Sequence, residues 1–99
     1  MKQNLSLITP GEVLLEEFLK PIKLTQNALA RALSVPPGRV NDIVLGRRVI
    51  TRDTAARLAI YFSTTPDFWL NLQCQFDAKI ASRDIMPKVA ATVRPPSAA

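Results

Sequence analysis

The side chains best suited to chemistry gather in one short stretch of this sequence, between residues 38 and 48. Asn41 carries an amide that can pair with the edge of an adenine, and Arg39 can contact guanine or phosphate through two parallel hydrogen bonds. Gly38 has no side chain and permits close approach of another molecule, and Arg47 and Arg48 add two cations. This combination indicates recognition of double-stranded nucleic acid.

The residue types needed for catalysis or metal binding are scarce. The chain has no histidine and one cysteine, Cys74, so it can form neither the usual zinc sites, nor a Cys/His nucleophile pair, nor an intramolecular disulfide. We interpret Cys74 as a small core or interface residue. Glu12, Glu16 and Glu17 lack a partner acid, base or nucleophile, so we interpret them as solvent-facing. We therefore expect no enzymatic activity and no cofactor.

The net charge of +5 is concentrated around the same stretch. Residues 31–57 carry six arginines and two aspartates, which gives this segment four surplus positive charges. Such a surplus can be an ordinary solvated basic face, or it can neutralise phosphates. Because it coincides with the candidate base contacts, we favour phosphate binding.

Two short helices joined by a tight turn are predicted to position these side chains. Thr25 can cap the first helix, which continues through Leu33. Val35 precedes a proline and is therefore disfavoured in helical conformation, and Pro37 suits the first position of a second helix that runs to about Leu45. The pattern is typical of a DNA-binding helix-turn-helix. An ordinary helical hairpin in a small bundle is the alternative.

The second of these helices is predicted to have two distinct faces. At about 100° per residue, Val40 and Ile43 fall on one side and form part of the core. The opposite side carries Gly38, Asn41, Asp42 and Leu45. Its N-terminal half is small and polar, which suits a helix lying against base edges in a major groove.

Threonines mark the start of the remaining three predicted helices. Thr9 and Glu12 have the spacing of a capping box before a helix that ends near Lys20. Thr51 and Thr65 precede the fourth and fifth helices. The fifth helix is predicted to continue to about residue 84, so we expect part of its apolar stripe to face another chain.

A chain of 99 residues suffices for one domain with a single core. We expect a loose lead-in over 1–8, a helix-turn-helix DNA-binding domain over 9–84 and a flexible tail over 85–99, where prolines recur without periodicity. No apolar run approaches the roughly 20 residues of a membrane helix, and the N-terminal run is too short for a secretory signal. A cytoplasmic location without membrane association is therefore expected.

Seven short segments, taken in order, resemble the HigA/VapI-type antidote proteins of the Xre/Cro helix-turn-helix family. They are Pro10-Gly11-Glu12, Leu15-Glu16-Glu17-Phe18-Leu19, Thr25-Gln26 with Leu29-Ala30, Gly46-Arg47-Arg48, Thr51-x-Asp53-Thr54-Ala55, Arg57-Leu58, and Pro66-x-Phe68-Trp69-Leu70-x-Leu72-Gln73. The resemblance covers about residues 9–80, and the Trp-Leu-x-Leu-Gln end is its most specific part. It implies an all-α, five-helix, lambda-repressor-like domain with the helix-turn-helix on helices 2 and 3. It also implies an antitoxin that represses its own operon as a homodimer on palindromic operator DNA and binds a HigB-type, messenger-RNA-cleaving toxin.

The resemblance also implies roles for single residues. Gln26, with Asn27 beside it, lies where family members contact the DNA backbone. Pro37, Gly38 and Asn41 match positions that approach bases, in agreement with their own chemistry.

Other site residues are assigned on their chemistry. We assign Arg39, Arg47, Arg48 and Thr51 to phosphates, with a guanine as a second target for Arg39. Asp42 can accept from cytosine or pair with an arginine, and we prefer the pairing.

Two residues depart from the family pattern. Ser34 occupies a turn position where glycine is usual, which predicts a turn that is either slightly strained or tightened differently. Leu45 replaces an asparagine and removes one phosphate contact. The functional alternatives are a stand-alone Xre-type regulator without a toxin partner and a pure protein-interaction module that sequesters a toxin.

Overall fold

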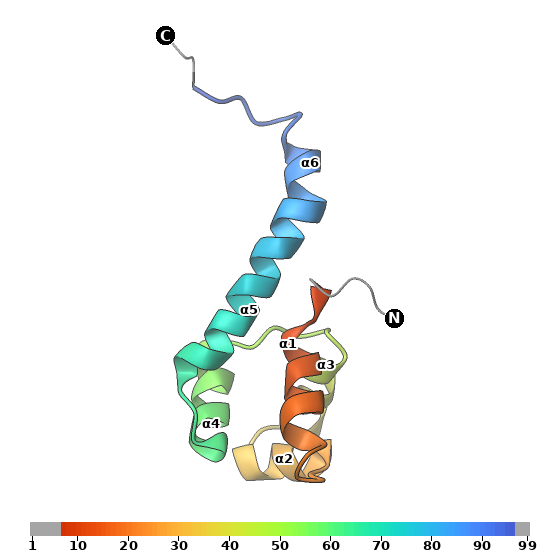
Figure 1. The fold of residues 1–99 in the computed structure, drawn as a ribbon, viewed down its shortest axis with the longest axis vertical. Helices are drawn as coiled ribbons and strands as arrows, with labels where there is room; N and C mark the ends of the chain where they lie inside the picture. Colours follow the sequence, from red (N-terminus) through yellow and green to blue (C-terminus); the bar gives the residue numbers. More distant parts are fainter. Residues whose placement is uncertain (1–6, 97–99) are drawn as a thin grey trace.

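The computed structural model describes residues 7–96, and the regular secondary structure of these residues is entirely helical (Figure 1). Its elements are α1 (Pro10–Val13), η2 (Leu14–Leu19), α2 (Gln26–Leu33), α3 (Pro37–Val44), α4 (Arg52–Phe62), α5 (Pro66–Ile80), η3 (Ala81–Ile85) and α6 (Met86–Val89). The π-helical segments η2 and η3 continue α1 and α5, so the body consists of the five expected helices, with α2 and α3 forming the helix-turn-helix.

Threonine hydroxyls begin four helices, as the sequence predicts. Thr25 Oγ1 accepts a hydrogen bond from the Ala28 amide at 3.1 Å, and Thr51 and Thr65 cap α4 and α5 in the same manner. Thr9 and Glu12 form the complete capping box, with the Glu12 carboxylate accepting from the Thr9 amide at 3.0 Å. Each cap stabilises its helix by about 1 kcal/mol, so the helix starts are fixed locally.

The turn between α2 and α3 passes through a left-handed residue. Ser34 has φ 58° and ψ 47°, a conformation that costs a non-glycine residue roughly 1–2 kcal/mol. The predicted strain at Ser34 is therefore confirmed. The Val35 amide donates to the Ala30 carbonyl at 3.0 Å and holds the turn closed despite that cost.

Trp69 is the centre of the core and is fully buried. Its indole N–H donates to Thr64 Oγ1 at 2.8 Å, and its rings lie 4.8 Å from the ring of Phe18, measured between centroids. Buried leucines from η2, α2 and α4 complete the core, among them Leu14, Leu29 and Leu58.

The C-terminal part of the chain differs from expectation. A tail without regular structure was expected from Ile85, but η3 and α6 carry the helix on to Val89 and away from the body (Figure 1). That part of the expectation is wrong: Pro87 lies at the second position of α6, directly after the π-helical segment η3, and does not end the helix. Residues 93–96 have no regular secondary structure, and 1–6 and 97–99 lie outside the described residues.

The projecting helix makes the molecule long, with extents of 57 × 32 × 22 Å and a radius of gyration of 16.6 Å. A compact chain of this length has a radius of gyration of about 13 Å. Within residues 7–96, none of the helices combines the length and the apolar character that a bilayer crossing requires.

Candidate nucleic-acid interface

Helix α3 has the two faces that its sequence predicts. Val40 and Ile43 are buried in the core, whereas Gly38 and Asn41 are exposed and Asp42 is half-buried. Leu45, at the C-terminal end of the outward face, is 54% exposed. The outward face is therefore small and polar at its N-terminal end and apolar at its C-terminal end.

Gly11 in the first helix allows α3 to pack closely against that helix. A Cβ on Gly11 would lie 2.8 Å from both the Ile43 carbonyl carbon and the Val44 Cα, and nearer still to the Ile43 carbonyl oxygen. No side chain fits there, so α1 and α3 pack backbone against backbone. In the sequence, Gly11 stands out only as part of the Pro10-Gly11-Glu12 motif, but a glycine inside a predicted helix is an available signal of such a close approach.

Arg57 holds the helix-turn-helix to α4 rather than standing free for phosphate. Its Nε donates to Asp53 Oδ2 and its Nη1 donates to the Leu33 carbonyl, each at 2.8 Å. The second bond satisfies a carbonyl at the end of α2, where the helix offers no donor. The hydrogen bond from Arg57 also lowers the pKa of the Asp53 carboxyl below its usual value. One of the six arginines in residues 31–57 therefore has a structural role.

The arginine loop, residues 46–50, leaves α3 along a defined path. The amides of Arg47 and Arg48 both donate to the Asp42 carbonyl oxygen, at 2.8 and 3.2 Å, while both arginine side chains are exposed. The expected ion pair between Asp42 and an arginine is not formed. In the described part of the chain the three ion pairs join other residues, so Asp42 fixes the loop through its backbone.

The ten sequence-predicted site residues come from three consecutive parts of the chain. Gln26 and Asn27 open α2, the middle group lies on α3, and Arg47, Arg48 and Thr51 follow α3. Most of them are exposed. Gln26, Arg39 and Asp42 are half-buried, and the Thr51 hydroxyl already caps α4.

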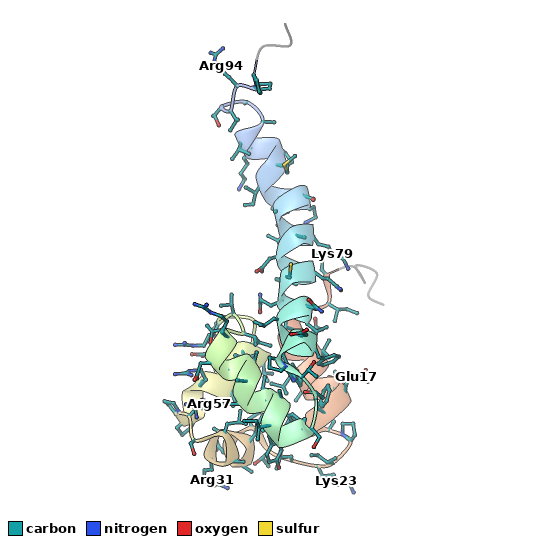
Figure 2. The ribbon with its side chains drawn as sticks, turned by 90° about the vertical axis from the view of Figure 1, so that its left-hand side faces the viewer. Glu17, Lys23, Arg31, Arg57, Lys79 and Arg94 are labelled. Carbon is teal, nitrogen blue, oxygen red and sulfur yellow. The ribbon has the colours of Figure 1, made fainter. Side chains whose placement is uncertain are left out.

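Charged side chains lie on opposite sides of the body. Figure 2 shows Arg31 and Arg57 on the side formed by α2 and α4, and Glu17 together with Lys23 on the opposite side. The three glutamates of the first helix are exposed, and Glu16 pairs with Lys20 at 2.9 Å, so their interpretation as solvent-facing residues is confirmed.

Cys74 is exposed on α5, so its interpretation as a core residue is wrong. That interpretation rested on the usual location of free cysteines, which are among the most buried residue types. A role at an interface with another chain stays a prediction.

Comparisons with known proteins place this arrangement among described regulators. Residues 15–69 match the family described as Helix-turn-helix. Virulence-associated protein I of Dichelobacter nodosus is 49% identical over 83 residues, which make up 84% of this chain and 77% of that protein.

Two solved structures are similar over nearly their whole length. An addiction module antidote protein of the HigA family from Coxiella burnetii is 47% identical, with a TM-score of 0.80 over 91% of this chain and 98% of that one. The Pseudomonas aeruginosa antitoxin HigA, solved with the higBA promoter, is 40% identical, with a TM-score of 0.83 over 92% and 99% of the two chains.

Proposed function

The chain belongs to the helix-turn-helix family, among the HigA-type antidote proteins, and from this premise we propose that it is an antitoxin and a repressor. It binds a palindromic operator, represses its own operon and neutralises a HigB-type, messenger-RNA-cleaving toxin. The observation that carries the DNA-binding part is the exposed polar face of α3 beside the two arginines of the loop. The relative solved with its promoter supports the same role. This is a family of DNA-binding regulators and not of enzymes.

The proposed division of labour follows from the chemistry of the side chains. Pro37, Gly38 and Asn41 approach base edges, where an amide distinguishes adenine from the other bases. The phosphate contacts fix the position of the protein and add affinity without sequence preference. Their proposed donors are Gln26, Asn27, Arg39, Arg47, Arg48 and Thr51. The half-buried Asp42 is left as a possible acceptor from cytosine.

We also propose a homodimer, because a two-fold protein matches a palindromic site. The projecting helix supports it: Ile85 is 45%, Met86 60% and Val89 38% exposed, all on a segment that leaves the body of its own chain (Figure 1). Contact with the same segment of a second copy would remove these apolar side chains from water. The two α3 helices of such a dimer would stand about 34 Å apart, one turn of DNA.

The experiment that tests the proposal is a binding titration with two DNA duplexes. Fluorescence anisotropy compares a duplex from the region upstream of this gene with a scrambled duplex of the same composition. A repressor is expected to bind the first at least about 10³-fold more tightly. Equal binding to both duplexes would overturn the repressor role.

The toxin is tested separately, by co-purification with the product of the neighbouring gene. Co-purification without sequence-specific DNA binding would favour the pure interaction module. DNA binding without a toxin partner would favour the stand-alone regulator.

A further inference from the structure

Gln73 joins α5 to the arginine loop across the body. Its Oε1 accepts a hydrogen bond from the Ile50 amide at 2.9 Å, although the two residues lie 23 positions apart in the sequence. Its Nε2 donates to Asp77 Oδ1 at 3.0 Å. A carboxylate can only accept, so this second bond fixes which end of the Gln73 amide faces Ile50. The side chain is therefore locked in the orientation that presents an acceptor to the loop.

The bond fixes the far end of the arginine loop. Ile50 is 2% exposed and directly precedes Thr51, the cap of α4, so its amide is removed from water. A buried amide left without an acceptor is costly, and the loop would have to move to regain one. The near end of the loop is already fixed, because the Arg47 and Arg48 amides donate to the Asp42 carbonyl.

The arginine loop borders a pocket on the side of α5, so its position depends on few contacts, among them the hydrogen bond to Gln73. The pocket of about 110 Å³ lies between the loop, α5 and the start of α1, and Arg47, Arg48, Gln73 and Phe76 are among its lining residues. Side chains therefore do not fill the space between Arg47, Arg48 and α5. The core packing of Ile50 and the hydrogen bond from its amide to Gln73 hold the far end of the loop.

We propose that Gln73 is a positioning residue for DNA binding, which holds the arginine loop where Arg47 and Arg48 meet phosphates. The inference rests on the proposed function, because the loop needs a fixed position only if it contacts DNA. It assigns a task to the last residue of the Trp-Leu-x-Leu-Gln motif, which the proposed function leaves unused. The task is indirect, since Gln73 itself lies on α5 and behind the loop.

The test compares two variants. Each variant removes a side-chain oxygen that accepts a hydrogen bond from one N–H group. Gln73→Met keeps the length of the side chain but removes the acceptor of Ile50. Thr64→Val is the matched control, because it removes the acceptor of the Trp69 indole N–H far from the loop. Both variants are expected to lower the melting temperature. Only Gln73→Met is expected to weaken binding to the upstream duplex, by about tenfold at low salt, and to reduce the dependence of affinity on salt.

The outcomes separate this inference from the proposed function. If the wild-type protein shows no preference for the upstream duplex, the proposed function fails. If the wild type binds and Gln73→Met retains the affinity and salt dependence of Thr64→Val, the inference alone is overturned.

A measurement on the wild-type protein covers the case in which Gln73→Met does not fold. Hydrogen exchange is expected to show the Ile50 amide protected to the level of the α4 amides. Exchange of that amide at the rate of an open loop would also overturn the inference.

Discussion

Gly11 lies against Ile43 so closely that a Cβ on the glycine would stand 2.8 Å from the Ile43 carbonyl carbon. The first helix and the recognition helix thus meet through their backbones. Gly11→Ala is expected to destabilise the protein by about 1–3 kcal/mol, because α1 must move away from α3 to make room. Urea unfolding measures the change. An unchanged midpoint would show that the two helices separate without cost.

Gly38 is the control for Gly11, because a Cβ on Gly38 would meet no atom within 4 Å. Gly38→Ala is expected to stabilise the protein by about 0.5–1 kcal/mol, since alanine loses less backbone entropy than glycine in a helix. The same change is expected to weaken binding to the upstream duplex, because the added methyl group occupies the face proposed to approach base edges. Urea unfolding and fluorescence-anisotropy titrations on one preparation measure the expected gain in stability and the expected loss of DNA affinity. Undiminished DNA binding would remove Gly38 from the interface.

Local signals explain why the helix starts were predictable. Thr25 and Thr65 cap their helices through amides only three residues away, so the sequence around each threonine contains the whole interaction. The outward face of α3 followed for a similar reason, because the helical period alone separates Val40 from Asn41.

Contacts between distant residues explain what could not be predicted. Arg57 reaches the Leu33 carbonyl 24 positions away, and Gln73 reaches the Ile50 amide 23 positions away. Leu33 and Ile50 take part through backbone groups, which nearly every residue type offers. Their side chains therefore give no sign of these contacts in the sequence. The continuation of the helix past Ile85 was missed for another reason: the sequence does not reveal the π-helical segment η3 that directly precedes Pro87 in the helix.

Asn41 is the residue proposed to read a base. Asn41→Ala is expected to cost about 1–3 kcal/mol on the upstream duplex and little on the scrambled one, because base contacts carry specificity and phosphate contacts do not. Parallel titrations of both duplexes measure the difference. Equal losses would mean that Asn41 reads no base.

Asp53 gives the protein a stability term that depends on pH. The hydrogen bond from Arg57 lowers the pKa of the folded-state carboxyl below its ordinary value of 3.8. The ionised form is therefore favoured by folding, so the contribution is present above the ordinary pKa and is lost as the pH falls through the lowered one. Urea unfolding at several acidic pH values is expected to show a smaller loss for Asp53→Asn than for the wild type. A carboxyl signal in NMR that titrates at the ordinary value would contradict this.

The arginine loop is proposed to supply affinity without sequence preference. Each phosphate that a cation neutralises releases condensed counterions, so each contact removed is expected to lower the slope of log affinity against log salt by about 0.9. The double variant Arg47→Ala with Arg48→Ala is expected to weaken binding to the upstream and scrambled duplexes in parallel, by an amount that shrinks as salt rises. Lys23→Gln with Lys79→Gln is the control, because it removes the same charge from positions away from the arginine side (Figure 2). Anisotropy titrations from low to moderate salt compare the two double variants, with circular dichroism to verify the fold. Equal slopes in the two would show that Arg47 and Arg48 act only through the net charge of the protein.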